Sequence, residues 1–310
     1  MSNTLYYGDN LPVLKQYIKD ESVDLIYLDP PFNSKANYNV LFEDYDGEKS
    51  AAQLEAFKDT WTWAEAALTY EELSLDTGPM GDALRAFGSL LHMGGMLAYL
   101  TMMAPRLKEL RRVLKHTGSI YLHCDPTASS YLKILMDAIY GPKMFRNEII
   151  WQRTSAHANV SQKFGSVHDV ILYYCVSDKT IWNQQYVPYD DEYLDTFFDQ
   201  IDDKGKRYAR RDLTAAMAHA SSGQLYTWKG ITPPPSRCWA MTKENMDKLE
   251  AEGRIHWPKK AGGMPRLKLY PDDLPGVPLQ DIWADIKTLG GRVCQDTGTA
   301  VIKVPSPPHC

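Results

Sequence analysis

The chain has 310 residues, of which 44% are hydrophobic and 24% charged, and its formal net charge at pH 7 is −5. No apolar run reaches the roughly 18 residues that a membrane helix needs, and the first residues lack the basic and apolar regions of a signal peptide. The negative charge does not by itself favour a nucleic-acid-binding protein, but a local basic face is enough to hold phosphates.

The cysteines are scattered along the chain, and no cysteine or histidine has the spacing of a metal site. They are Cys124, Cys175, Cys238, Cys294 and Cys310. We therefore expect reduced thiols in a cytoplasmic protein, with no metal site and no membrane association.

Strands and helices alternate along the first 150 residues. A short apolar strand near Leu5 precedes a turn and a helix start, and residues 23–28 form the continuous apolar run of a buried strand. Residues 33–80 predict a long loop with some helix. Further elements are predicted over residues 96–114 (helix), 119–123 (strand), 129–140 (helix) and 147–151 (strand). This order predicts an α/β fold with a doubly wound parallel sheet.

The composition changes after Arg153. Residues 154–280 are rich in proline, glycine, tryptophan and tyrosine, and their one clear helix runs from Thr242 to Gly253. The residues from Gly291 onward show little periodicity. The sequence therefore predicts three regions, 1–153, 154–280 and 281–310.

The strongest chemical signal is the motif Asp29, Pro30, Pro31 and Phe32 at the end of the strand over residues 23–28. An enzyme that methylates an exocyclic amine must take the base out of the duplex and align the lone pair of its nitrogen with the methyl group. The Asp29 side chain and the Pro30 carbonyl can accept hydrogen bonds from that amine, and two prolines stiffen the turn that presents them. Phe32 can stack on the flipped base, which contributes about 1–3 kcal/mol. The alternative is a strand-end turn with an incidental acidic residue.

The motif and several other stretches closely resemble the β-group amino-methyltransferases of restriction–modification systems. These stretches are Leu5–Leu11, Val23–Ser34, Gly118–Asp125, Phe145–Trp151, Gly263–Arg266 and Leu279–Trp283. The resemblance implies a Rossmann-like, S-adenosylmethionine-dependent methyltransferase sheet whose strand order is circularly permuted. It also implies methyl transfer from S-adenosylmethionine to the N6 amine of an adenine in double-stranded DNA.

The resemblance also implies roles for individual regions and residues. Asp9 and Asn10 would lie near the adenosine of the methyl donor, where Asp29 would also contribute. Residues 1–153 would form the catalytic core, and 154–280 would be an inserted target-recognition region. Residues 281–310 would return toward the core before an atypical tail. A restriction endonuclease, a second subunit or a second copy of the chain would be a partner.

One segment of the family pattern is not found. In this family a glycine-rich donor-binding segment follows the stretch that ends at Trp283, whereas here the resemblance stops near residue 288. We interpret the chain as truncated or frame-shifted there, with an incomplete sheet. The missing segment leaves open a catalytically inactive DNA-binding remnant or split-enzyme subunit. Separate alternatives to adenine methylation are cytosine N4 methylation and methylation of RNA or protein.

Two basic clusters in the 154–280 region are candidates for phosphate contacts. The first contains Lys204, Lys206, Arg207, Arg210 and Arg211 around Tyr208, and the second contains Lys259, Lys260, Arg266 and Lys268 near Trp257 and Tyr270. Each could equally be a solvated surface. We also expect His123, Cys124 and Asp125 to line the rim near Asp29, and Trp151 and Arg153 to contact the base or its phosphate.

Overall fold

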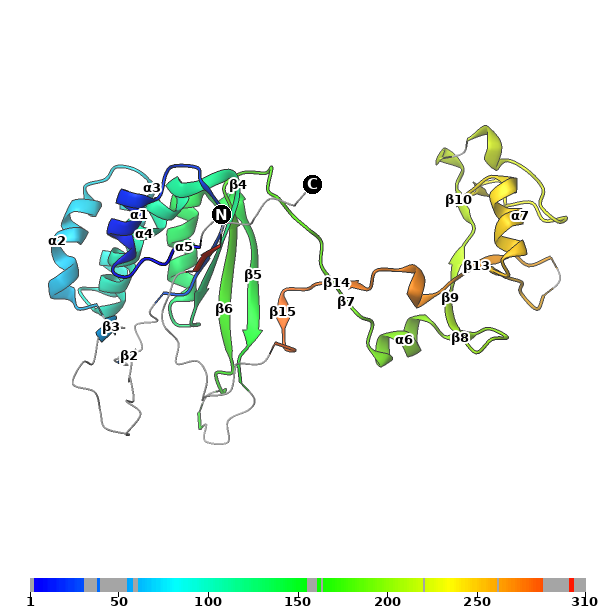
Figure 1. Ribbon diagram of the computed structural model, residues 1–310. Coiled ribbons are helices and arrows are strands. Elements are labelled where there is room, and N and C mark those ends of the chain that lie inside the picture. Colours follow the sequence, from blue (N-terminus) through cyan, green and yellow to red (C-terminus); the bar gives the residue numbers. More distant parts are fainter. Residues whose placement is uncertain are drawn as a thin grey trace. The chain divides into compact units, whose positions relative to one another are not determined.

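The computed structural model describes residues 3–30, 61–154, 161–162, 164–219, 221–260 and 262–286, together with the backbone of three short strands: β2 (Tyr38–Asn39), β3 (Glu55–Phe57) and β16 (Val301–Lys303). The chain forms two compact units. One contains residues 1–182 and 280–310, and the other contains residues 183–279 (Figure 1). In the described residues, no helix is long and apolar enough to span a membrane.

The first unit is built on a six-stranded sheet with the order β15-β5-β6-β4-β1-β16. Its other strands are β1 (Val23–Leu28), β4 (Leu114–Cys124), β5 (Phe145–Gln152), β6 (His168–Cys175) and β15 (Ile282–Trp283). β1 is parallel to β4, and β15 is parallel to β5. β6 is antiparallel to both β4 and β5, and β16 is antiparallel to β1.

The sheet is therefore mixed. Its β1–β4 and β15–β5 pairs agree with the predicted parallel sheet, whereas the pairs made by β6 and β16 are antiparallel. A parallel neighbour needs a crossover connection, usually a helix, but none of the described residues between β5 and β6 is helical. β6 pairs antiparallel with both β4 and β5, so it runs against its neighbours. The apolar strand predicted near Leu5 is also absent, because residues 3–7 pair with no strand.

Five helices cover one face of this sheet. They are α1 (Asn10–Tyr17), α2 (Trp63–Ser74), α3 (Pro79–Leu91), α4 (Gly95–Val113) and α5 (Ser129–Tyr140). Figure 1 shows them on the same side, so among the described residues the sheet is covered by helices on one face and is not doubly wound. Ile26, Leu122 and Leu172 point into the main core from three adjacent strands, and Leu100 and Leu107 of α4 pack in the same core.

The opposite face of the sheet is aromatic. Tyr121 and Tyr173 stack there with ring centroids 4.5 Å apart, and Trp151 and Trp283 pack against the same cluster. Alternation along each strand sends these side chains to the face away from the helices.

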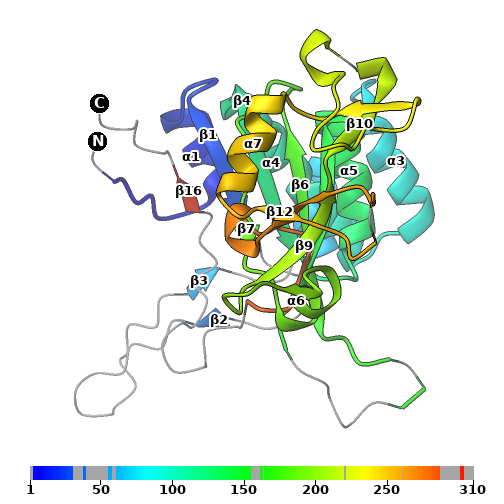
Figure 2. The same ribbon diagram turned by 90° about the vertical axis from the view of Figure 1, so that its right-hand side faces the viewer.

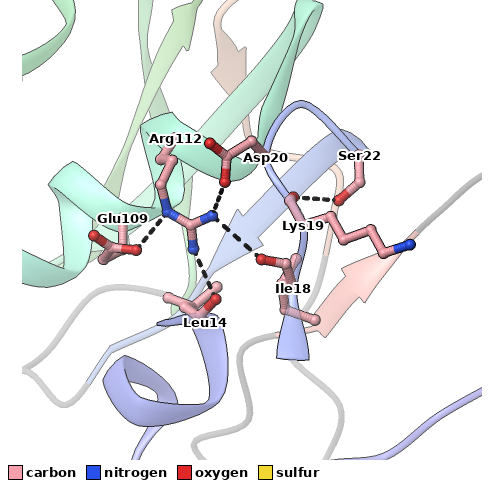
Figure 3. Close-up of polar contacts among 7 residues, drawn as sticks. All are labelled: Leu14, Ile18, Lys19, Asp20, Ser22, Glu109 and Arg112. Carbon is pink, nitrogen blue, oxygen red and sulfur yellow. Dashed lines mark hydrogen bonds and ion pairs between the residues drawn. The ribbon is translucent and has the colours of Figure 1, made fainter. Parts of the chain in front are cut away.

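The entry into β1 is fastened to the end of α4 by Arg112 (Figure 3). The Arg112 guanidinium donates to the Glu109 carboxylate at 2.7 Å, to the Leu14 carbonyl at 2.8 Å and to the Ile18 carbonyl at 3.3 Å, and it also pairs with Asp20. One side chain thus satisfies the carbonyls that end α1 and fixes the turn that leads into β1.

The second unit is mostly strands and turns around a small core of its own. Its main sheet has the order β12-β13-β9-β8, made of β8 (Gln200–Ile201), β9 (Arg207–Asp212), β12 (Ile255–His256) and β13 (Arg266–Leu269). Two further strand pairs join β10 (Thr214–Ala216) to β11 (Arg237–Trp239) and β7 (Tyr186–Val187) to β14 (Val277–Pro278).

Two helices complete this unit, α6 (Asp191–Phe197) and α7 (Lys243–Ala251). α7 lies beside the main sheet in both Figure 1 and Figure 2 and buries Met246 against Trp228 and Trp239. The prediction of a helix from Thr242 to Gly253 is confirmed, since Thr242 precedes the first turn and Gly253 follows the last with a positive φ of 71°.

Candidate functional site

The candidate site lies at one edge of the six-stranded sheet, where three strands bring polar side chains together. Asp29 directly follows β1, and His123 is next to last in β4. Because β1 and β4 are parallel, with Leu28 opposite Leu122, both side chains reach the same edge. β6 runs the other way and brings Asp169, near its start, to that edge.

His123 joins two carboxylates. Its Nδ1 lies 3.1 Å from Asp29 Oδ1, and its Nε2 lies 3.3 Å from Asp169 Oδ2. Arg153 continues the chain of charges, with its Nε 3.3 Å from Asp169 Oδ1. The His123 and Asp169 side chains are buried, whereas Asp29 keeps about a third of its side chain exposed (35%). Asp29 is therefore the carboxylate of this network that can meet a substrate.

The geometry favours a doubly protonated His123. A neutral imidazole carries one N–H and can donate to only one of the two carboxylates, while an imidazolium donates to both. Burial by itself lowers the pKa of His123, but hydrogen bonds and charge from Asp169 and Asp29 outweigh that effect and raise the pKa to about 9. The network thus alternates negative and positive charges at neutral pH.

Aromatic rings enclose the network. The edge of the Trp151 ring meets His123 with centroids 5.6 Å apart, and the Tyr27 ring lies 6.4 Å from the imidazole. Burial, followed by the negative charges of Asp29 and Asp169, raises the pKa of Tyr27 to about 12, so its hydroxyl stays protonated. The Trp151 indole donates to the Ile286 carbonyl at 2.8 Å, which holds the ring in place.

The rest of the predicted motif is only partly within the described residues. Pro30 is buried next to Asp29. Pro31 and Phe32 lie outside the residues that the structure describes, so the predicted stacking ring stays a prediction.

The predicted donor-binding residues Asp9 and Asn10 lie at the start of α1. The Asp9 carboxylate caps the helix by accepting from the Leu11 amide, and both of its oxygens accept from Arg106 at 2.8 and 2.9 Å. Arg106 also donates to the Asn10 side chain and lies over the Trp61 ring. About half of the Asp9 side chain remains exposed (51%), so its carboxylate keeps capacity to accept further hydrogen bonds.

The neighbours of His123 have structural contacts. Cys124 points into the helix-covered core, where burial raises the pKa of its thiol and makes the thiolate unfavourable. Asp125 accepts a hydrogen bond from the Ala128 amide at 3.0 Å, in the turn that leads into α5. Asp169, in contrast, is a member of the site that sequence reasoning missed. The available signal was an acidic residue at the start of an apolar run, within residues assigned to DNA recognition.

The second unit brings the two predicted basic clusters onto one sheet. β9 pairs with β13 so that Arg210 lies opposite Lys268, and Arg266 lies opposite Asp212. Side chains opposite each other in an antiparallel pair share a face, so Arg210, Arg266 and Lys268 lie on one face together with Tyr208. His256 joins them and approaches the Tyr208 hydroxyl at 2.8 Å. We call this set the β9–β13 basic face.

The charge of the β9–β13 basic face is partly balanced. Burial and then the charges of Arg210, Lys268 and Arg266 lower the pKa of His256, which indicates a positive local potential. Arg210 pairs with Asp199 at 3.2 Å, and Arg266 pairs with Asp212 at 3.4 Å. A phosphate group would have to displace these carboxylates or share the cations with them.

The remaining predicted basic residues lie around this sheet. Lys204 and Lys206 belong to the turn before β9, where both of their amides donate to Asp202. Arg207 pairs with Asp195, and Arg211 is exposed on the opposite face, across from Leu267. Lys259 and Lys260 are exposed in the connection that follows β12. Among the described residues, no group of histidine, cysteine, aspartate or glutamate side chains could hold a metal ion.

Comparison with known proteins identifies the family of the chain. A family model described as DNA methylase, of the N6 and N4 type, matches residues 23–275. The Type II methyltransferase M.EcaI of Enterobacter cloacae is 28% identical over 288 residues, covering 93% of this chain and 53% of that protein. The StyLTI Mod subunit of a Type III restriction-modification enzyme from Salmonella typhimurium is 26% identical over 289 residues, covering 92% of this chain and 41% of that protein.

A solved structure gives a weaker likeness. A DNA modification methylase of Thermus thermophilus, complexed with S-adenosyl-L-methionine, aligns with a TM-score of 0.28 and 12% identity. The alignment covers 60% of this chain and 58% of that one. A likeness of this size does not bear on the details of the fold. The chain spans about half the length of the curated relatives it matches.

Proposed function

We propose, from the premise that this chain belongs to the N6 and N4 DNA methylase family, that it methylates the N6 amine of an adenine in double-stranded DNA. Members of the family use S-adenosylmethionine as the methyl donor. The observation that supports the proposal best is the position of Asp29. Its carboxylate is partly exposed at the end of a buried strand and is backed by a buried histidine.

The chemistry that these residues can perform is alignment of the amine. The amine of adenine is a poor nucleophile because its lone pair is delocalised into the ring. We propose that the Asp29 side chain and the Pro30 carbonyl accept hydrogen bonds from the two N–H groups of the amine. These bonds would direct the lone pair of the nitrogen toward the methyl group. The nitrogen would then gain the methyl group as the carbon–sulfur bond of the donor breaks and leaves a thioether. The nitrogen would lose one proton, which the Asp29 carboxylate can accept. The bound donor supplies the electrophilic methyl group on its sulfonium.

We further propose that Asp9 and Asn10 hold the adenosine part of the donor, and that Asp29 lies where donor and base meet. The half-exposed Asp9 carboxylate has the acceptor capacity that a hydroxyl or amine of the donor requires. Arg106 and Trp61 fix its orientation. The residues present thus suit the adenosine end of the donor.

We propose that the second unit, residues 183–279, is the part of the predicted 154–280 region that binds DNA. It would form the inserted target-recognition region of a circularly permuted methyltransferase, with the β9–β13 basic face in contact with phosphates. Lys268, from the second predicted cluster, shares the face of Arg210, from the first. The relative from Salmonella typhimurium is named a Mod subunit, so association with a restriction subunit is part of this proposal.

Substitution of Asp29 tests the proposed chemistry. We expect Asp29→Ala to abolish methyl transfer to adenine-containing duplex DNA while DNA affinity changes by less than about 3-fold, because the phosphate contacts lie elsewhere. Transfer of a labelled methyl group measures the first quantity, and fluorescence anisotropy measures the second. Calorimetric titration with S-adenosylmethionine separates a loss of chemistry from a loss of donor binding.

The matched control is Asp24→Ala, at the opposite end of the same strand. Asp24 pairs with Lys115 away from the site, so transfer per folded molecule should persist. Near-normal turnover in Asp29→Ala would refute the role of this carboxylate. Mass spectrometry of the nucleosides identifies the product. Detection of N4-methylcytosine would show that cytosine, and not adenine, is the target base. Absence of any transfer by a folded chain that still binds DNA would favour a non-catalytic DNA-binding role.

A further inference from the structure

We propose that His123 is a positioning residue that selects which oxygen of Asp29 receives the substrate amine. This inference rests on the proposed function and adds to it a role for a residue that acts through Asp29. The observation that carries it is the pair of contacts that His123 makes, one with Asp29 and the other with Asp169.

The first step of the argument concerns the two oxygens of Asp29. Oδ1 lies 3.1 Å from His123 Nδ1, at hydrogen-bond distance, so this oxygen faces the interior. A carboxylate that is held at one oxygen cannot turn about its terminal torsion without breaking that bond. The other oxygen, Oδ2, is therefore the one presented to the amine, in a fixed direction. An unsupported carboxylate at a strand end would sample several orientations.

The second step concerns what holds His123 itself. Asp169 Oδ2 lies 3.3 Å from the second ring nitrogen, and the Asp169 side chain is almost fully buried, with 4% exposed. Trp151 meets the imidazole edge-on and limits its tilt. The imidazole ring is thus held at both nitrogens and by Trp151. Its contact with Asp29 therefore fixes the position of that carboxylate relative to the sheet.

The third step concerns the charge around His123. Among the residues that the structure describes, the titratable and charged groups facing His123 include Asp29 and Tyr27 from β1 and its end and Asp169 from β6. Arg153, from the end of β5, reaches it through Asp169. Two carboxylates against one distant guanidinium favour the imidazolium, which can donate to both acids. The pKa of about 9 supports this protonation state.

Two substitutions of His123 separate positioning from folding. His123→Asn keeps a donor near the place of Nδ1 but cannot reach Asp169, while His123→Phe keeps a ring and removes both donors. We expect single-turnover methyl transfer to fall about 100-fold in His123→Phe, the size of effect that a misplaced reacting group produces. His123→Asn should recover transfer to within about 10-fold of the wild type. DNA affinity should stay within about 3-fold of the wild type in both variants.

The pH profile gives a readout that a purely structural histidine would not move. In the wild type, the rate should fall as pH rises through about 9, because His123 then loses its second proton. His123→Asn should lack that limb of the profile. A His123→Phe variant that transfers at the wild-type rate would overturn the proposal. So would a His123→Asn variant that loses as much activity as His123→Phe while melting at the wild-type temperature.

A spectroscopic test keeps the inference separate from the proposed reaction. Nitrogen-15 spectra of the wild-type chain at pH 7.5 should show two protonated ring nitrogens for His123, and Asp29→Asn should lower its titration midpoint. An imidazole protonated on Nε2 alone, with no proton on Nδ1 to donate to Asp29, would overturn the positioning role, whatever the enzyme assay shows. If the wild-type chain transfers no methyl group, the proposed function fails, and the spectrum still decides whether His123 holds Asp29.

Discussion

The residues at the candidate site have unequal environments, and this inequality assigns their roles. His123 and Asp169 are buried and satisfied by each other, whereas Asp29 stays partly open to solvent. A buried charge is tolerated only when it is paired and hydrogen-bonded. His123 thus allows Asp169 to be buried as a charged group, and Asp29 is left as the carboxylate with exposed surface.

Stability should depend on pH through His123. Its pKa is about 9 in the folded chain and about 6.5 in the unfolded chain, so the contribution is fully present below pH 6.5 and is lost as pH rises through about 9. The shift corresponds to about 3 kcal/mol. We compare the free energy of unfolding of the wild type with that of His123→Asn at two pH values. The amount by which the wild type is more stable should be about 3 kcal/mol smaller at pH 9.5 than at pH 6. Urea unfolding at both pH values measures it.

The control for this prediction is His116, an exposed histidine on the same strand. The same measurement on His116→Asn gives the pH dependence of replacing a histidine on this strand outside the site. A difference for His123→Asn that does not change with pH would mean that its imidazole is neutral in the folded chain. The hydrogen-bond assignment to both carboxylates would then be wrong.

At the scale of elements, the site depends on how β1 is held. The strand lies between β4 and β16, and its entry is fixed by Arg112 from the end of α4. Hydrogen bonds that involve a charged group contribute about 1.5–3 kcal/mol each when they replace water, and their partners do not act additively. The register between β1 and β4, on which the Asp29–His123 contact depends, is thus supported from a point outside the site.

Replacement of Arg112 by methionine should lower the free energy of unfolding by about 2 kcal/mol, because two main-chain carbonyls lose a donor. Lys108→Met is the matched control on the same helix. Lys108 is exposed, and its nearest carboxylate, Asp76, is 4.0 Å away, so the effect should be within about 0.5 kcal/mol. Chemical denaturation of both variants measures the difference. Equal effects would show that Arg112 does not fasten the entry into β1.

Some elements could be predicted from the sequence because their patterns are local. The strand over residues 23–28 and the helix over residues 129–140 occur with the predicted bounds, and the predicted helix over residues 96–114 is observed as α4, Gly95–Val113. The direction of β6 could not be predicted in this way. Whether a strand runs parallel or antiparallel depends on the connection to it and on its neighbours in the sheet. The residues of β6 itself, His168–Cys175, carry no information about either.

The candidate site was predictable in part for the same reason. Asp29 stands next to prolines at a strand end, a pattern visible in one short stretch. Asp169 is 140 residues further along the chain by number, and only the pairing of β6 with β4 brings it to His123. The β9–β13 basic face is a similar case, since Arg210 and Lys268 belong to separate sequence clusters that meet by strand pairing.

At the scale of the whole molecule, a net charge of −5 must be reconciled with the proposed binding to DNA. The second unit gathers cations on the β9–β13 basic face and pairs two of them with carboxylates. Repulsion within the unbound protein is thereby reduced. A phosphate backbone can then compete for the same cations, at a cost set by the carboxylates that it displaces.

DNA affinity should therefore fall steeply with salt, and single substitutions should change the slope. Each phosphate neutralised contributes a slope of about −0.9 to the logarithm of the association constant against the logarithm of the salt concentration. We expect Arg210→Ala and Lys268→Ala each to weaken binding and to make the slope less negative by about 1. Lys243→Ala, at the exposed start of α7, is the matched control and should leave the slope unchanged. Anisotropy titrations of the full chain at several salt concentrations measure these slopes. An affinity that does not respond to salt, or variant slopes equal to that of the wild type, would remove the β9–β13 basic face from the DNA interface, and the phosphates of the substrate would then have to be held by other residues.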